Sequence, residues 1–244
     1  MTTIALAGKG GSGKTTTAGL IINYFLQKGK KPILAIDADP NNTLDEVLGV
    51  SVDRTVVSTV DEIMDEKERI PAGMTKERLL EFHLQDAIIE SKGFDLLAMG
   101  RTEGQGCYCR ANDLLRAFME KLQENYRYVV MDNEAGMEHL SRRTTRDVDF
   151  LLIIANPTSV SLKSAERIQA TAGKLKLNIK KTHLIINELG INPLAGSTET
   201  NLPLLGRIPY DEELLRISMS GGSVFDLSED STAKKAVFAI IGNL

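Results

Sequence analysis

The stretch from Gly8 to Thr15 constrains the fold of this chain more than any other part of the sequence. Gly8 and Gly13 are separated by four residues and are followed by Lys14 and Thr15, which is the pattern of a phosphate-binding loop. A short apolar run at 3–7 precedes the pattern. After it, apolar residues recur at helical spacing, at Ala18, Ile21, Ile22, Phe25 and Leu26. A loop between a strand and a helix is the context that this motif requires, so we predict that the stretch binds phosphate.

The residue types of this loop indicate what it binds. Glycines let the backbone bend so that several N–H groups converge on an anion, and the positive end of the following helix points to the same place. In such a loop Lys14 reaches the β- and γ-phosphates of a nucleotide, and the hydroxyl of Thr15 binds Mg²⁺. We predict nucleotide contacts along the whole loop, from Gly8, Lys9, Gly10, Gly11, Ser12, Gly13, Lys14, Thr15 and Thr16.

Short apolar runs alternate with helical segments along the rest of the chain. Residues 44–91 are charged and helical in character. Apolar runs predict strands at 33–36, 96–99, 128–131, 150–155, 183–186 and 204–208, and helical spacing predicts helices at 115–122, 162–175 and 233–241. Alternation of this kind is typical of mostly parallel sheets that are covered on both faces. We therefore predict an α/β phosphate-loop NTPase fold, with a mostly parallel central sheet flanked by helices on both faces, as one domain over 1–244.

Acidic side chains follow two of these predicted strands. Asp132 comes directly after the apolar run 128–131, the arrangement of a Walker-B site that holds Mg²⁺ directly or through a water. Asp37 and Asp39 follow the run 33–36. Ligands in parallel α/β sheets bind at the carboxyl ends of the strands, so we expect these acids to lie near the phosphate loop. For Asp37 and Asp132 a role as a turn or cap residue is the alternative.

The composition argues against several classes of function. Hydrophobic residues make up 42% of the 244 residues, yet no run approaches the ~18 apolar residues of a membrane span. The net charge of −4 and the absence of Trp give no case for nucleic-acid binding. The phosphate-loop pattern begins so early that a cleaved signal peptide is not expected. We therefore expect a cytoplasmic protein that binds neither a membrane nor nucleic acid.

The phosphate loop carries a second lysine, Lys9, directly after its first glycine. The segment from Lys9 to Thr16 resembles the deviant phosphate loop of the MinD/ParA/nitrogenase-iron-protein class. The resemblance implies a homodimer in which Lys9 reaches the nucleotide of the other subunit and acts in catalysis together with Lys14. It also implies that Asp39 aligns the attacking water and that Asp37 supports the Mg²⁺ shell. A solvated loop lysine is the alternative for Lys9.

Two further residues bear on the choice of nucleotide. The Asn-Lys-x-Asp segment of guanine-specific GTPases does not occur in the sequence, which favours ATP over GTP. By resemblance to the MinD class, Asn187 faces adenine and Pro209 begins a loop that closes over the base. A buried asparagine at a strand end and a plain turn proline are the alternatives.

The chain has two cysteines, Cys107 and Cys109, on either side of one tyrosine. A disulfide between them would be strained, and two thiolates fall short of the four ligands of a closed Zn²⁺ site. Two copies of the chain would supply four thiolates, which suit Zn²⁺, Ni²⁺ or Cu⁺ equally. Two ordinary cysteines near a helix start are the alternative.

The segments Gly106–Arg110 and Met131–Leu140 make the resemblance narrower. They are similar to those of the CooC-type nickel-insertion ATPases of carbon monoxide dehydrogenase maturation, a family that includes accessory ATPases for acetyl-CoA synthase. The resemblance covers essentially the whole chain. It implies that Cys107 and Cys109 bind nickel or zinc between two subunits and that a nickel enzyme is the client. The roles of Glu134 and His139, the metal and the order of ATP and metal binding stay open.

Two other functions remain alternatives. A positioning ATPase of the MinD/ParA type would favour a basic amphipathic C-terminal helix, whereas residues 236–244 are short and apolar, as in core packing. An ATP-dependent redox protein would hold an iron–sulfur cluster on the four cysteines of a dimer.

Overall fold

The computed structural model describes residues 1–41, 43–65, 75–101, 117–134, 147–175, 177–188, 190 and 200–244. Residues 117–123 are helical. The other elements are, in chain order, β1 (Thr2–Gly8), α1 (Lys14–Gln27), β2 (Ile33–Asp37), α2 (Leu44–Leu48), α3 (Val56–Asp65), α4 (Lys76–Asp86), β3 (Ile88–Glu90), β4 (Asp95–Ala98), β5 (Tyr128–Asp132), β6 (Asp147–Ala155), α7 (Ser159–Lys174), β7 (Asn178–Asn187), β8 (Leu204–Ile208), α8 (Glu212–Met219), the 3-10 helix η2 (Val224–Asp226) and α9 (Thr232–Gly242).

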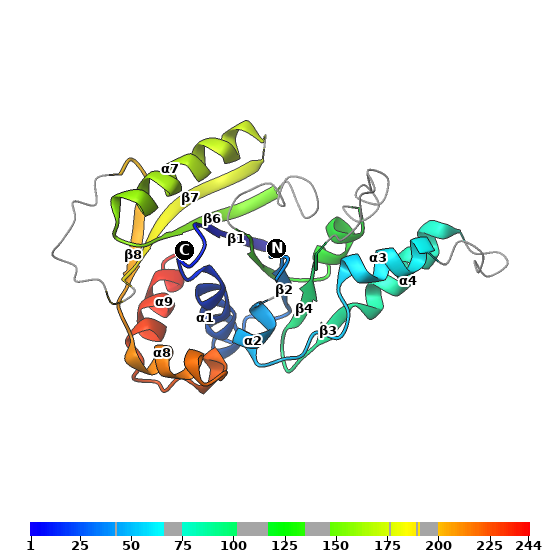
Figure 1. The fold of residues 1–244 in the computed structure, drawn as a ribbon, viewed down its shortest axis with the longest axis horizontal. Coiled ribbons are helices and arrows are strands. Elements are labelled where there is room, and N and C mark those ends of the chain that lie inside the picture. The colour runs from blue at the N-terminus through cyan, green and yellow to red at the C-terminus, as the bar shows by residue number, and fades with distance from the viewer. Residues whose placement is uncertain are drawn as a thin grey trace.

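The described residues form one sheet of eight strands, in the order β3-β4-β2-β5-β1-β6-β7-β8 (Figure 1). All neighbours pair in parallel except β3 and β4, which are antiparallel. The predicted mostly parallel α/β sheet is therefore confirmed. Parallel strands need crossover connections, and helices supply them on both faces of the sheet.

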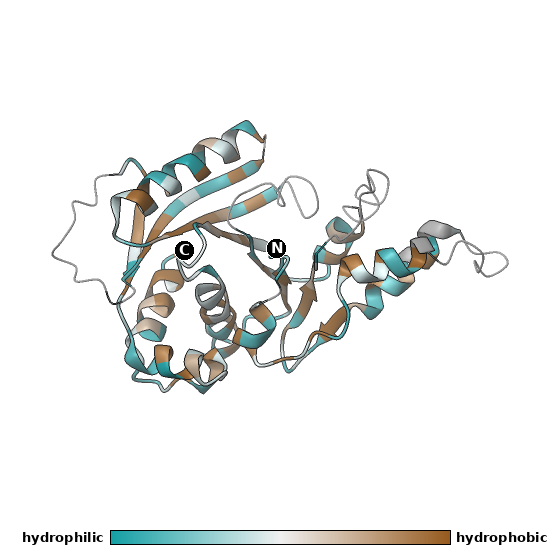
Figure 2. Ribbon diagram, in the orientation of Figure 1, coloured by the Kyte–Doolittle hydropathy of each residue, from teal (hydrophilic) through white to brown (hydrophobic). Residues whose placement is uncertain are grey.

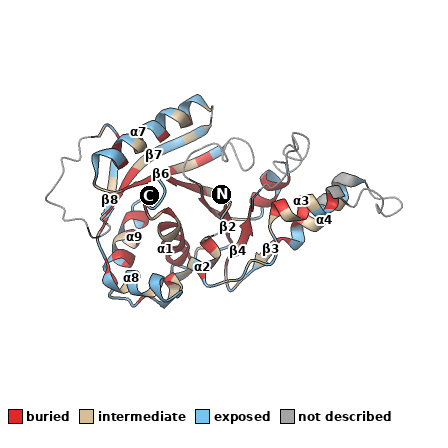
Figure 3. Cartoon of the chain, viewed as in Figure 1, coloured by how far each residue is buried: buried red, intermediate tan, exposed pale blue. Residues whose placement is uncertain are grey.

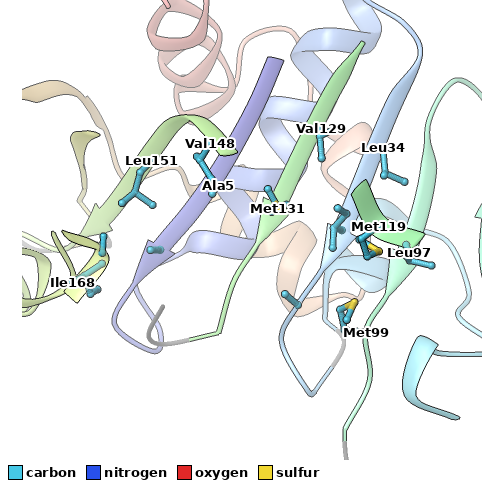
Figure 4. Packing of buried hydrophobic residues seen from close by; sticks show 14 of the residues in the cluster. Ala5, Leu34, Leu97, Met99, Met119, Val129, Met131, Val148, Leu151 and Ile168 are labelled. Atoms are coloured by element: carbon cyan, nitrogen blue, oxygen red, sulfur yellow. The ribbon is translucent and has the colours of Figure 1, made fainter. Parts of the chain in front are cut away.

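Alternate side chains of the strands enter two hydrophobic cores, one on each face of the sheet. Ala5 and Ala7 point to the face covered by α3, α4, residues 117–123 and α7, and this core is shown in Figure 4. Ile4 and Leu6 point to the opposite face, covered by α1, α2 and α9. Figures 2 and 3 show the result, since the central strands are largely hydrophobic and buried. Because both faces are covered, the strands are nearly continuous apolar runs instead of alternating ones.

The strand register brings the polar strand ends to one edge of the sheet. Asp37 is paired with Asp132 across β2 and β5, and Asp132 is also level with Leu6 of β1. Asn187 is paired with Ile208 across β7 and β8. The phosphate loop leaves β1 at the same edge, after Gly8. The strand register therefore brings Gly8, Asp37, Asp132 and Asn187 to the same end of the sheet.

Some boundaries differ from those predicted. Strand β7 begins at Asn178 instead of His183, and the edge strand β3 and helix α8 were not predicted. The run 44–91, predicted to be helical in character with turns at Gly49, Pro71 and Gly73, forms three helices and β3 over its described residues. None of the described helices is both long and apolar enough to cross a membrane.

Candidate active site

The loop between β1 and α1 needs glycine at three positions, for different reasons. Gly11 and Gly13 have φ of +73° and +92°, a region in which residues with a Cβ atom are strained. A Cβ atom on Gly8 would collide with the carbonyl oxygen of Ile154 and lie 2.7 Å from Ser12 Oγ. The loop closes on itself where Ser12 N donates to the carbonyl of Lys9 at 3.1 Å. The sequence thus fixes a tight backbone curve at the start of α1.

The two lysines of the loop lie in different environments. Lys14, the first residue of α1, is only 7% exposed, whereas Lys9 is exposed. The first turn of α1 carries no acidic side chain, so the positive end of the helix dipole is not neutralised by its own residues. Together the helix end and Lys14 make this edge of the sheet an anion site.

Asp132 is buried against this anion site. It is 1% exposed, and among the described residues neither of its carboxylate oxygens has a hydrogen-bond partner. Burial raises the pKa of Asp132 to about 7, and the negative charge of Asp37 adds to the rise. The hydroxyl of Thr15 and the charge of Lys14 lower this pKa, but by less than burial raises it. The Thr15 hydroxyl lies near the carboxylate without making a regular hydrogen bond to it.

Asp37 is the second buried acid of this edge. Its Oδ1 accepts from Asp39 N at 3.0 Å and its Oδ2 accepts from Leu44 N at 2.9 Å. Burial nevertheless raises the pKa of Asp37 to about 6, since the two amide hydrogen bonds lower it by less. Asp39 is half-buried and its Oδ1 accepts from the backbone N–H of Asn41 at 2.9 Å. The Asp37 carboxylate thus shapes the turn that carries Asp39.

Asp132, Asp37 and Thr15 fit Mg²⁺. Mg²⁺ takes hard oxygen ligands, commonly one or two carboxylates together with substrate phosphates and water. The unpaired, buried oxygens of Asp132 are acceptors that a cation or its water ligands would satisfy. The described residues contain no group of three or more His, Cys, Asp or Glu side chains that could hold a metal. A nucleotide-dependent Mg²⁺ site, in which phosphates and waters complete the ligand set, is compatible with these residues.

A cavity of about 240 Å³ lies beside the phosphate loop and contains both residues that were predicted at the base. Asn187 and Pro209 line it together with Gly13, Thr16, Thr17, Leu20, Ile208, Tyr210, Asp211, Leu214, Leu215 and Ser218. Asn187 is 7% exposed and donates from Nδ2 to the carbonyl of Ser12 at 3.0 Å. The mixture of apolar walls and a few polar groups is typical of a small-molecule site.

Comparison with known proteins identifies the family. The family described as AAA domain matches residues 1–186, which include the phosphate loop and both Asp37 and Asp132. The chain belongs to this AAA domain family. An ATP-binding protein of Methanocaldococcus jannaschii is 39% identical over 96% of this chain and 94% of its own length. The carbon monoxide dehydrogenase accessory protein CooC of Rhodospirillum rubrum is 32% identical over 92% of this chain and 90% of its own length.

The fold is that of MinD/ParA ATPases. The septum site-determining protein MinD of Pyrococcus horikoshii, solved with Mg-ADP, superposes with a TM-score of 0.69 at 21% identity, covering 100% of this chain and 96% of that one. This member of the AAA domain family is an ATPase with the MinD/ParA-type fold.

In this ATPase, Asp211 secures the wall of the cavity, a role that the sequence analysis missed. Its carboxylate accepts from Leu214 N at the start of α8, and from Ser231 Oγ and Ala233 N at the start of α9. These bonds outweigh burial and hold the pKa of Asp211 at about 2. The signal was present, because an Asp three residues before an apolar helix position is a helix N-cap.

The predicted phosphate-loop residues, the three acids, Asn187 and Pro209 all lie at one edge of the sheet. Lys9 is at the same edge but points to solvent. Cys107 and Cys109, predicted as metal ligands, and His139 lie outside the described residues.

Proposed function

We propose that this ATPase is a dimerising metallochaperone that serves the nickel-dependent maturation of carbon monoxide dehydrogenase, acetyl-CoA synthase or a related enzyme. The observation that supports it most is the 32% identity to a carbon monoxide dehydrogenase accessory protein over 92% of this chain. The Cys-x-Cys pair at Cys107 and Cys109 adds a thiolate donor set that suits such a cargo. In this proposal the protein acts in the cytoplasm.

The exposed position of Lys9 supports dimerisation. Lys14 is buried beside the phosphate site and serves the nucleotide of its own subunit, whereas the exposed side chain of Lys9 is available to a second copy. A cation supplied in trans to a transferring phosphoryl group raises turnover by about 10³–10⁵ in other systems. The proposed homodimer places Lys9 of each subunit at the nucleotide of the other.

The chemistry proposed for the site is phosphoryl transfer from ATP to water. Transfer of this kind depends on positioning and charge stabilisation more than on a strong base. The backbone N–H groups of the loop and Lys14 hold the phosphates, and Asp39 orients the attacking water. Thr15, Asp37 and Asp132 would hold Mg²⁺, which neutralises charge on the phosphates when bound. Loss of the γ-phosphate relaxes the loops that follow Asp39 and Asp132.

The proposed cargo site lies between the two subunits. Closure of the dimer brings two copies of Cys107 and Cys109 together as four thiolates for nickel or zinc. Ligand thiols must ionise, so metal binding releases protons. Hydrolysis opens the dimer and passes the metal to the client enzyme.

Size-exclusion chromatography with metal analysis tests the proposal, with and without ATP and nickel. We expect a dimer and bound metal in the presence of both ligands. Lys9→Ala should lose ATP-dependent dimerisation and turnover, whereas Lys28→Ala, an exposed lysine at the far end of α1, should keep them. A monomeric Lys9→Ala protein with full activity would exclude the trans role.

The cysteine variants separate the cargo site from the ATPase. Cys107→Ala and Cys109→Ala should keep ATP binding and lose the metal of the dimer, measured as metal per subunit on purified protein. Unchanged metal stoichiometry in both variants contradicts the shared site.

A positioning ATPase is the second candidate, because the fold is that of MinD. Helix α9 itself does not offer an apolar face to a membrane, since Val237, Ile240 and Ile241 are buried against the rest of the fold. Co-sedimentation with anionic liposomes or DNA would favour positioning, and a brown chromophore in anaerobically purified protein would favour an iron–sulfur protein.

A further inference from the structure

Asn156 lies at the point where strands β6 and β7 separate, next to the predicted base contact Asn187. The last paired residues of the two strands are Ala155 and Ile186. The backbone cannot extend the ladder, because Asn156 N donates to Ser161 Oγ at 3.0 Å and Pro157 has no N–H. The side chain of Asn156 supplies the next hydrogen bond instead, from Nδ2 to the carbonyl of Asn187 at 3.2 Å.

This hydrogen bond holds Asn187 on the β6 side, while pairing with Ile208 of β8 holds its backbone on the other side. A further hydrogen bond runs from Asn187 Nδ2 to the carbonyl of Ser12 in the phosphate loop, at 3.0 Å. The same nitrogen lies so close to Gly13 that a Cβ atom there would collide with it. Asn187 is thus fixed at its backbone by β8 and Asn156, and at its amide by the loop.

Because Asn187 Nδ2 is bound to Ser12, the side-chain oxygen of Asn187 is the atom available to a ligand in the cavity. An asparagine amide has one NH₂ group and one carbonyl oxygen, and with the nitrogen bound to Ser12 the oxygen remains for a ligand. Adenine presents an amino group as donor where guanine presents a carbonyl acceptor. An acceptor held in place at this position favours adenine and disfavours guanine, and a loosely held one discriminates less.

We propose that Asn156 is a positioning residue for base selection, acting through Asn187. The inference rests on the proposed ATP site, in which Asn187 contacts the base. Without the Asn156 amide, the carbonyl of Asn187 loses this donor, and only β8 and the Ser12 carbonyl hold the acceptor of Asn187, less firmly than before. The phosphates are bound by the loop and Lys14, away from Asn187. Loss of the Asn156 hydrogen bond should therefore reduce the preference for adenine over guanine more than it weakens phosphate binding.

The test compares Asn156→Ala and Asn156→Asp with the unmodified protein, by calorimetric titration of ATP and of GTP with Mg²⁺. Losing one hydrogen bond corresponds to about a three- to tenfold fall in the ratio of the two Kd values. Asn156→Asp keeps the shape but turns an acceptor toward the Asn187 carbonyl, so its effect should be at least as large. KM for ATP should rise by a similar factor, with a smaller change in kcat.

Asn178 provides a matched control on the same pair of strands. Its Nδ2 donates to Asp147 Oδ1 at 2.7 Å, at the amino ends of β6 and β7 and with the same separation of 31 residues. Asn178→Ala should leave the ATP to GTP ratio unchanged. Equal effects of Asn178→Ala and Asn156→Ala, or an unchanged ratio in the folded Asn156 variants, overturn the inference.

Asn187→Ala separates this inference from the proposed site. If Asn187→Ala loses discrimination and the Asn156 variants retain it, Asn187 contacts the base but Asn156 does not position it. If Asn187→Ala retains discrimination, the assignment of Asn187 to the base is wrong as well. Thermal unfolding of each variant shows whether it is folded at the assay temperature.

Discussion

The three glycines Gly10, Gly11 and Gly13 form a graded series in which backbone strain and steric collision can be measured separately. Alanine at Gly10 meets no atom within 4 Å, and its φ is not in the left-handed region. Alanine at Gly11 also has open space, but φ is +73°. Alanine at Gly13 has φ of +92° and collides with the amide nitrogen of Asn187. From Gly10 to Gly11 the alanine variant gains the strain of a left-handed backbone, and from Gly11 to Gly13 it also gains a steric collision.

The expected losses in the free energy of unfolding follow from these contacts. Gly10→Ala should change it by no more than about 0.5 kcal/mol. Gly11→Ala should cost about 1–2 kcal/mol, the penalty of a left-handed residue with a Cβ atom. Gly13→Ala adds the displacement of Asn187 from the buried carbonyl of Ser12, worth about 1–3 kcal/mol. The sum for Gly13→Ala is therefore about 2–5 kcal/mol.

Urea unfolding of the nucleotide-free protein, followed by circular dichroism, measures these values. A double-mutant cycle isolates the collision, because in an Asn187→Ala background Gly13→Ala should cost no more than Gly11→Ala does. A coupling energy of about 1–3 kcal/mol is expected. Equal costs for Gly11→Ala and Gly13→Ala, or no coupling to Asn187, would refute the reasoning.

Two further predictions concern buried carboxylates. The pKa of Asp211 is lowered from 3.8 to about 2. Its carboxylate therefore contributes about 2 kcal/mol to the free energy of unfolding above pH 4, and this contribution is lost as the pH falls toward 2. Asp211→Asn should remove this pH dependence, and an unchanged slope of the unfolding free energy between pH 5 and 3 would contradict the prediction. The pKa of Asp132 is raised from 3.8 to about 7, so the free energy of unfolding falls as the pH rises from about 4 to about 7, and the full penalty remains above that value. Asp132→Asn should remove this penalty, stabilise the Mg²⁺-free protein by about 1–3 kcal/mol at pH 8 and abolish Mg²⁺-dependent ATP hydrolysis. A less stable Asp132→Asn protein in EDTA would show that the carboxylate has a stabilising partner.

The central sheet was predictable because its strands are covered on both faces. Runs such as Ile33–Ile36 and Tyr128–Met131 are apolar throughout, and an acid follows each of them at the carboxyl end. Parallel pairing puts the carboxyl ends of these strands at the same end of the sheet, which is why Asp37 and Asp132 could be expected to lie together. The phosphate loop was predictable because its glycines have a sequence pattern of their own.

Other parts of the fold depend on tertiary contacts that no short pattern carries. Strand β3 has three residues, Ile88–Glu90, and exists through antiparallel pairing with β4. Helix α8 has no fully buried residue, and Leu214 and Ile217 are only partly buried against the core, yet the helix forms a wall of the cavity beside the phosphate loop. The bond from Asn156 to Asn187 joins residues 31 positions apart and depends on the strand register.

The packing of α1 restricts how this ATPase could transmit the state of its nucleotide. Residues Thr17–Phe25 of α1 are buried, and the helix contacts β1, β5, α2 and α9. Asn23 is also tied to the carbonyl of Val224 at 3.3 Å. A helix enclosed in this way serves as a stationary frame, and its backbone amides should exchange with deuterium only on global unfolding. Any rearrangement on hydrolysis is then left to parts of the chain other than α1, so a spectroscopic label on α1 would serve as a fixed reference.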